Sequence, residues 1–344
     1  MRNFFPILEE CVYLNTAYTA PLAAPLLAWR QQDEQAYLNK ADRYKLENEK
    51  QYIVDAEQRL ALFSGAEVGH AFVTTNFSVA FHHALTFLPS DAHFLLLEEE
   101  YPSLLGTVQS MGFTSTVIKV THDVEATVFS TLAQHPIDVL AISMVQYSSG
   151  ILFDLDLLKK IKAAFPEILI LVDVTQYLGA ELFSLSETPI DAIFGSTYKW
   201  LMAGHGTGFA VFQSSFFTHV HKDLAQIREV YDRGQCSVSA VGSLAFMLDV
   251  LSQQDVENLL LQKDRLAMQL RQGLLQRNLL DSRVAQRSKH SSIYTFNATE
   301  EVFHRLLEKN IRCIQRGMGI RVSVHHYNNA DDLTQFFAAL DASI

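Results

Sequence analysis

The chain has 344 residues, 49% of them hydrophobic and 19% charged, so it exceeds the usual size of a single domain and can bury a large core. Its net charge of -11 arises from acidic and basic residues mixed along the whole length, which leaves no basic stripe for nucleic acid. The first residues lack a long apolar core behind a basic flank, and no stretch approaches about 18 apolar residues, so we expect a cytoplasmic protein that does not span a membrane.

The cysteines and histidines show no disulfide or metal-binding pattern. Cys11, Cys236 and Cys313 are far apart and outside any CxxC spacing, which indicates reduced thiols. Several of the 13 histidines come in pairs, but none of these pairs lies with carboxylates at metal-ligand spacing. We therefore expect no metal site.

The first two thirds of the chain alternate helical and strand patterns. Residues 44–63 keep apolar positions near the helical period and end at Ser64 and Gly65, a helix stop signal. Beyond them, short β-branched apolar runs alternate with amphipathic stretches, which indicates a doubly wound, mainly parallel sheet of seven strands covered by helices. The seven predicted strands are residues 71–75, 93–100, 114–120, 138–145, 168–175, 192–197 and 208–213.

The sequence pattern changes after Gly234. Long helical stretches fill residues 238–278, short strands follow at 291–298 and 319–324, and a last helix is predicted at 331–342. This pattern indicates a smaller C-terminal α+β domain. The predicted division is an N-terminal segment, 1–15, near the small domain and the active site, a large domain, 16–235, and a small domain, 236–344.

Two polar side chains follow neighbouring strands of the predicted sheet. Asp173 stands at the carboxyl end of an apolar strand, which is where open α/β sheets bind ligands. Lys199 comes directly after another strand, so the two side chains can converge on one crevice. A desolvated lysine has a lowered pKa and becomes an amine nucleophile toward carbonyl groups. The alternative is a structural ion pair between Asp173 and Lys199.

Several segments resemble the class V aminotransferase family of fold type I pyridoxal 5′-phosphate (PLP) enzymes, which includes cysteine desulfurases and isopenicillin epimerase-like proteins. VDVTQYLGA followed by STYKWLMAGHGTGFAVF is similar to the cofactor-binding signature of that family. Four further segments, VYLNTAYTAPL, EYPSLL, VQYSSGILFDL and GIRVSVHHYNNADDL, resemble its other landmarks in the same order. The resemblance covers nearly the entire chain.

The resemblance implies a role for each matching residue. Lys199 would hold the PLP aldehyde as a Schiff base and then move the proton at the substrate Cα. Asp173 would pair with the pyridinium nitrogen and keep the ring an electron sink. Gln176 would bond the ring's phenolate oxygen, and Tyr101 would stack on the ring in place of a histidine common in the desulfurases. Tyr147 is assigned a cofactor contact near the ring.

The phosphate of the cofactor needs several hydrogen-bond donors. Asn76, Phe77 and Ser78 form a polar turn between a strand and a helix start, and helix N-termini bind anions. The alternative for Asn76 and Ser78 is ordinary N-capping of that helix. The family match implies that Ser196 and Tyr198 also hold the phosphate, and that Gln235, in a loop with Gly234, reaches the phosphate of a neighbouring subunit. A homodimer is therefore expected.

Arg321 and the cysteines bear on which reaction the predicted enzyme catalyses. Arg321 matches the family's clamp for the substrate carboxylate, for which a guanidinium fork suits bidentate bonding. Cys313 lies in an apolar context that would bury it, whereas Cys236 lies in the loop expected near an active site. We predict an aminotransferase acting on an α-amino acid. A cysteine desulfurase or another α,β-eliminating C–S lyase, and a non-catalytic binding module with the same fold, remain as alternatives.

Overall fold

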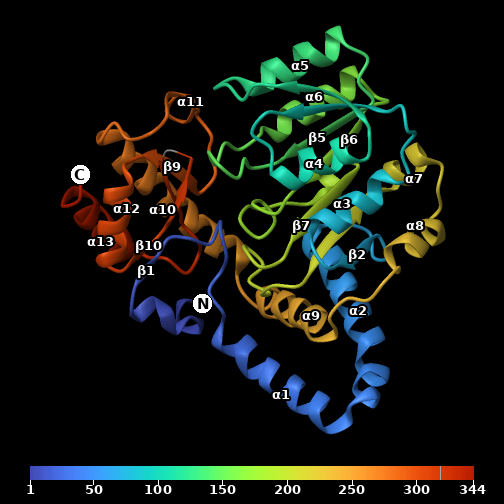
Figure 1. Cartoon of the computed structure of the whole chain (residues 1–344), viewed down its shortest axis with the longest axis horizontal. Helices are drawn as coiled ribbons and strands as arrows, with labels where there is room; N and C mark the ends of the chain where they lie inside the picture. The colour runs from blue at the N-terminus through green and yellow to red at the C-terminus, as the bar shows by residue number, and fades with distance from the viewer. Residues whose placement is uncertain (318) are drawn as a thin grey trace.

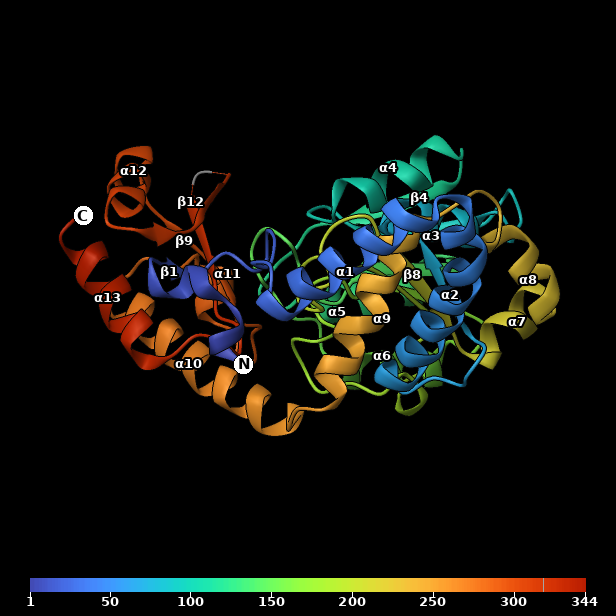
Figure 2. The same cartoon turned by 90° about the horizontal axis from the view of Figure 1, so that it is seen from below.

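The structure is a computed structural model that describes residues 1–317 and 319–344. It has two parts (Figure 1): a large part built around a seven-stranded sheet, and a smaller part at the C-terminal end of the chain. The N-terminal segment runs along the smaller part before the chain enters the large part (Figure 1, Figure 2). No helix of these residues is long and apolar enough to cross a membrane.

The central sheet has the predicted seven strands. Strand β8 pairs antiparallel with both of its neighbours, and all other pairs in the sheet are parallel. The prediction of a mainly parallel α/β sheet is therefore confirmed. In spatial order the strands are β2 (Ala71–Thr74), β8 (Gly208–Phe212), β7 (Ala192–Ser196), β6 (Leu169–Asp173), β5 (Val139–Ser143), β3 (His93–Leu97) and β4 (Thr114–Ile118).

Hydrophobic cores cover both faces of the sheet. Leu169 and Leu171 in β6 point into one core, whereas Ile170 and Val172 point into the other, because successive strand residues face opposite sides. Burial on both faces explains why the strands are continuous apolar runs. One face is covered by α3 (Phe77–Leu85), α4 (Pro102–Ser110), α7 (Ser214–Val220) and α8 (Leu224–Tyr231), and the other by α2 (Asp42–Ser64), α5 (Val124–Gln134), α6 (Leu155–Ala164) and α9 (Val238–Ser252).

Two long helices precede the sheet. The helix predicted at 44–63 is α2, and it ends at Gly65 in the left-handed conformation, with φ of 68°, as the stop signal indicated. A Cβ atom at Gly65 would lie 2.3 Å from Ser184 Oγ, so glycine is also required there by close packing. Helix α1 (Ala24–Lys40), which the sequence analysis did not identify, packs against α2 and α9.

The smaller part contains a three-stranded antiparallel sheet in the order β11 (Ile314–Arg316), β12 (Gly319–Ser323) and β9 (Ile293–Asn297). The N-terminal strand β1 (Val12–Tyr13) pairs with β10 (Ile311–Arg312). Helix α9 packs on α1 and α2 of the large part. It begins at Val238, which is beyond the predicted domain boundary at 235/236. The position of that boundary stays a prediction. The helices are α10 (Val256–Gln276), α11 (Ser282–Ala285), α12 (Glu300–Glu308) and α13 (Ala330–Asp341).

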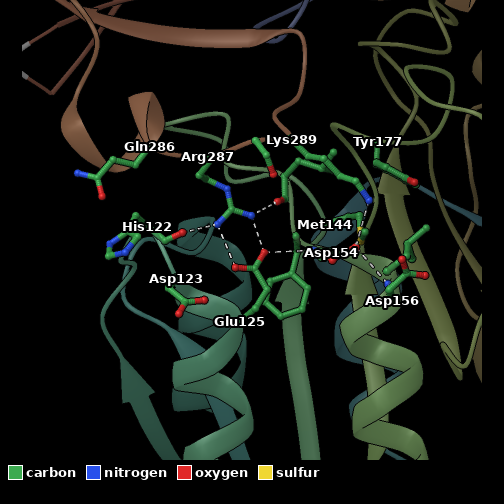
Figure 3. A pocket seen from close by; sticks show the side chains of 14 residues that line it. His122, Asp123, Glu125, Met144, Asp154, Asp156, Tyr177, Gln286, Arg287 and Lys289 are labelled. Atoms are coloured by element: carbon green, nitrogen blue, oxygen red, sulfur yellow. Dashed lines mark hydrogen bonds and ion pairs between the residues drawn. The ribbon is translucent and has the colours of Figure 1, made fainter.

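Direct hydrogen bonds hold the two parts together. Figure 3 shows Arg287, from the segment after α11, reaching the carboxylate of Glu125 at the start of α5; Nη1 and Oε2 are 3.0 Å apart. Ser291 Oγ donates to the carbonyl oxygen of Gly150 at 2.6 Å, and Thr295 donates to the carbonyl of Ser148. These bonds place β9 and β12 next to the loop that follows β5.

Candidate active site

Lys199 lies in the turn that follows β7. The backbone of this turn is fixed by bonds from Ala203 N to the Thr197 oxygen at 3.1 Å and from Ala20 N to the Tyr198 oxygen at 2.9 Å. The Lys199 residue is 7% exposed. Burial, and then the charge of Arg321, lower the pKa of its amine to about 7. Near neutral pH a large share of the amine is therefore uncharged and nucleophilic.

Asp173 ends β6 and shares a cavity with Lys199. Its Oδ1 accepts the backbone N–H of Thr175 at 2.7 Å, and the hydroxyl of Thr175 accepts the N–H of Ser196 at 3.1 Å. Burial raises the pKa of Asp173, while the bonds from Thr175 and the charge of Lys199 act in the opposite direction. No direct ion pair joins Asp173 to Lys199 within the described residues, so the alternative of a structural ion pair between them does not hold.

Lys199 lines a small, partly enclosed cavity. The structure brings eight of the twelve predicted site residues to it. The lining consists of Phe77, Tyr101, Tyr147, Asp173, Gln176, Ser196, Tyr198 and Lys199, together with Ser143, Val145 and Thr175, which the sequence analysis had not assigned.

Two aromatic rings lie close to the lysine amine. The Lys199 Nζ atom lies 5.9 Å from the ring centre of Tyr101 and 5.5 Å from that of Tyr198. Tyr101 meets Tyr147 edge-on, with ring centres 5.7 Å apart, and it meets Phe77 in the same manner at 6.1 Å. The predicted stacking residue Tyr101 is therefore held by aromatic neighbours on two sides.

The side-chain amide of Gln176 has a fixed orientation. Its Oε1 accepts the indole N–H of Trp200 at 2.8 Å, and its Nε2 donates to the carbonyl oxygen of Ala17 at 2.8 Å. Because an indole N–H can only donate, this network assigns the amide oxygen to the Trp200 side. One N–H of Gln176 is then left to donate to a group in the cavity.

Of the three residues in the predicted phosphate turn, 76–78, Phe77 lines the Lys199 cavity. The backbone N–H of Phe77 donates to Ser196 Oγ at 3.2 Å, which joins the start of α3 to the end of β7. The Asn76 side chain caps α3 by accepting from Val79 N at 3.0 Å, as the N-capping alternative had it. Asn76 and Ser78 do not line the cavity in the described part of the chain. Their phosphate contacts stay a prediction.

Gln235 does not line the Lys199 cavity. It is exposed and lines a separate cavity between α2 and α8, together with Cys236 and Glu57. The expectation that Gln235 reaches a neighbouring subunit is compatible with this position and stays a prediction.

Arg321 lies behind the cavity and not in its lining. Its residue is 2% exposed, and one N–H of the guanidinium donates to the carbonyl oxygen of Tyr147. Its Nε has no hydrogen-bond partner among the described residues. Burial and the nearby charge of Arg316 lower the pKa of Arg321 to about 9. A buried guanidinium without a carboxylate partner is suited to bind an anion from outside.

Glu100 is a buried carboxylate next to the site. Its position there was not predicted from the sequence. It accepts hydrogen bonds from Ser143 N at 3.0 Å, from Gln146 Nε2 at 3.0 Å and from the Ser143 hydroxyl. Burial raises its pKa to about 7, to which the charge of Asp173 contributes. The available signal was an acidic residue just beyond the apolar strand 93–97, immediately before Tyr101.

The three cysteines are outside the lining of the Lys199 cavity. Cys313 is buried, which confirms the expectation for it, and burial raises its pKa to about 12. Burial also raises the pKa of Cys11 and of the half-buried Cys236. Thiols with raised pKa values are poor nucleophiles at neutral pH, because the thiolate is the reactive form.

Comparison with known proteins identifies the family. No curated protein matches the sequence. A mutant of C-DES with glycine covalently linked to its PLP cofactor has a similar structure, with a TM-score of 0.86 and 15% identity over 99% of this chain and 98% of that one. Cysteine desulfurases from Thermococcus onnurineus NA1 (TM-score 0.81, 16% identity, 99% and 97% coverage) and from Escherichia coli (CsdA; 0.80, 17%, 99% and 97%) are also similar.

These identities are low, so the likeness shows a shared fold. The family model of the class V aminotransferases matches residues 12–336, nearly the whole chain. Enzymes of this family depend on PLP, and the predictions of family, fold and cofactor are confirmed at that level. The chain belongs to the class V aminotransferase family.

Proposed function

We propose that this protein is a PLP-dependent enzyme acting on an α-amino acid, most directly an aminotransferase, with the cofactor attached to Lys199. The observation that carries the proposal is the buried Lys199 amine, with a pKa of about 7, in one cavity with the Asp173 carboxylate. Burying these two charged groups without a direct ion pair is unfavourable for folding. This arrangement disfavours a non-catalytic binding module.

The residues around the cavity suit the groups of PLP. Asp173 would face the pyridinium nitrogen, Gln176 has an N–H to offer to the phenolate oxygen, and Tyr101 would cover the ring. Ser196 and the N–H of Phe77, at the start of α3, would hold the phosphate. When bound, the cofactor would supply an electron sink for the electrons released at the substrate Cα.

The protein's own groups perform the remaining tasks. The neutral amine of Lys199 would accept the proton from the substrate Cα and return it to the product, a role for which a pKa near the working pH is best suited. Arg321 would bind the substrate carboxylate and thereby orient the Cα–H bond toward Lys199. The burial of both side chains excludes water, which strengthens these electrostatic interactions.

An α,β-eliminating C–S lyase is the second candidate, because it would use the same lysine, aspartate and arginine. One structure with the same fold is described as the cystine C–S lyase C-DES in complex with cysteine persulfide. A desulfurase that uses a thiolate of its own chain is disfavoured, because Cys11, Cys236 and Cys313 have raised pKa values and lie outside the cavity lining.

A substrate screen tests the proposed function. The PLP-loaded protein is given single amino acids with and without a keto-acid acceptor, and keto acid, alanine and sulfide are measured separately. We expect a keto acid that forms only when an acceptor is present, in an amount equal to the acceptor converted. Keto acid, ammonia and sulfide formed without an acceptor would replace the aminotransferase by the lyase, and alanine with sulfide formed from cysteine would replace it by a desulfurase.

The protein is proposed to act as a homodimer. Gln235 is exposed in a loop, and the helices α1 and α2 carry exposed apolar side chains, among them Tyr37, Leu38 and Leu46. A second copy with twofold symmetry would cover such a surface. Light scattering is expected to give twice the mass of 38.8 kDa, and a monomer with full PLP occupancy at working concentration would contradict the proposal.

A further inference from the structure

Arg316 is a second guanidinium near the candidate site, and the sequence analysis assigned it no role. It ends β11, is half-buried, and its Nε is buried without a hydrogen-bond partner in the part of the chain that is described. Its guanidinium lies over the ring of Tyr18, 5.5 Å from the ring centre, and Nη1 donates to the carbonyl oxygen of Gln315 at 3.3 Å. No carboxylate of the described residues forms an ion pair with it.

The register of the small sheet puts Arg316 and Arg321 on the same face. Ile314 pairs with Arg321 and Arg316 pairs with Gly319, so the two arginines are diagonal neighbours on adjacent antiparallel strands. Diagonal neighbours lie roughly 7–8 Å apart, within reach of long side chains. Ile320, between Gly319 and Arg321, points into the hydrophobic core, so the face with the arginines is turned away from that core.

This face is directed at Lys199. Arg321, on this face, donates to the carbonyl oxygen of Tyr147, which lines the Lys199 cavity. The charges of Arg321 and Arg316 both act to lower the pKa of the Lys199 amine, in agreement with this placement. Ser323, on the same face of β12, accepts the N–H of Ala17, whose carbonyl oxygen binds Gln176. The face is thus connected to the cavity wall.

Two like charges on one face repel each other, and neither has a carboxylate partner within the described residues. Like-charge pairs that lack a counter-ion destabilise the folded chain, so an anionic ligand that bridges them would relieve the repulsion. One substrate carboxylate satisfies one guanidinium fork by bidentate bonding. The second guanidinium then remains for another anionic group of the same molecule.

We propose that Arg316 and Arg321 together bind the two carboxylates of an amino acid with an acidic side chain, or of the matching dicarboxylic keto acid. This inference rests on the proposed function and names its substrate class. Arg321 holds the α-carboxylate and Arg316 holds the side-chain carboxylate, with Tyr18 packed against the guanidinium of Arg316.

The test uses acids that have no amino group and therefore cannot react. Calorimetry measures the binding of succinate and glutarate to the protein with PLP added, next to the monocarboxylates butyrate and pentanoate of the same chain length. We expect the diacids to bind about tenfold to a hundredfold more tightly, as for one additional charge-assisted contact. Equal affinity for diacids and monoacids in the wild type would overturn the inference.

The variants separate the two arginines. Arg316→Gln is expected to lower the affinity for the diacids to that for the monoacids, whereas Arg321→Gln should weaken the binding of both. Arg312→Gln replaces an exposed arginine four residues away and should keep the preference for diacids. An Arg316→Gln protein that keeps its PLP absorbance and melting temperature, and still prefers diacids, would refute the role of Arg316.

Kinetics with reacting substrates provide a second measurement. Arg316→Gln should lower kcat/KM for glutamate about tenfold or more relative to norvaline, which has the same chain without the second carboxylate. Failure of this inference is distinguishable from failure of the proposed function. An enzyme that converts amino acids without preferring diacids refutes the inference alone, while a protein that prefers diacids but takes up no PLP refutes the proposed function alone.

Discussion

Replacing Lys199 by alanine is expected to abolish covalent attachment of PLP and to lower turnover by at least about 10²- to 10⁴-fold, the usual contribution of a general acid–base group. The fold should remain, because the side chain of Lys199 makes no hydrogen bond or ion pair among the described residues, and its backbone bond to Met202 N is unaffected. The measurement is borohydride reduction followed by peptide mass mapping. The matched control is Lys160→Ala on the exposed side of α6, which should behave as the wild type.

The lysine also gives the attachment of PLP a characteristic pH dependence. With a pKa lowered to about 7, the amine of the folded protein is protonated below pH 7 and neutral above it. The rate at which PLP attaches to the apoprotein should therefore rise through about pH 7 and level off above, well below the range of an ordinary lysine. A rate that continues to rise toward pH 10, or a pyridoxyl group found on another lysine, would contradict the assignment.

The fold was predictable because its strands are local and strongly patterned. Apart from the edge strand β4, each strand of the central sheet is a short apolar run, and burial on both faces distinguishes these strands from half-exposed ones. Helix α1 was missed because its apolar residues do not form a clear stripe, and only Leu26 among its apolar side chains is fully buried. Its packing on α9 depends on residues more than 200 positions away.

The site was predictable to the extent that function resides in a contiguous segment. Asp173, Gln176, Ser196, Tyr198 and Lys199 all lie close together in the sequence, at the ends of two neighbouring strands, and the structure brings them to one cavity. Contacts between distant segments were not visible in the sequence. The bond between Gln176 and Ala17 joins residues 159 positions apart, and Glu100 meets Ser143 only because β3 and β5 are neighbours in the sheet.

The position of Arg316 next to Arg321 was also not predictable from the sequence. In the sequence it is one charged residue in a short segment before Arg321, and an exposed strand arginine would look identical. Only the pairing of β11 with β12 places both guanidiniums on one face. The small sheet therefore points to a substrate class that spacing along the chain does not reveal.

Asp173→Asn is expected to keep PLP attached but to lower kcat/KM by roughly a hundredfold or more. A neutral amide cannot keep the ring nitrogen protonated, and a lost charge-assisted bond of about 3 kcal/mol corresponds to that factor. PLP occupancy is measured by absorbance and kcat/KM by the product assay. The variant Asp173→Glu retains the carboxylate and is expected to recover part of the activity. An Asp173→Asn enzyme with the wild-type rate would contradict the pairing with the ring.

Asp173→Asn should not lower the stability of the apoprotein, although it lowers the activity of the enzyme. Burial raises the pKa of Asp173 in the folded state, so the folded chain binds this proton more tightly than the unfolded chain, and the carboxylate lowers stability as pH rises above its unfolded pKa. Asparagine has the same shape, can still accept the N–H of Thr175, and carries no charge to desolvate. We therefore expect the melting temperature of apo Asp173→Asn at pH 7 to equal or exceed that of the wild type. A purely structural carboxylate would give the reverse, a loss of stability together with the loss of activity.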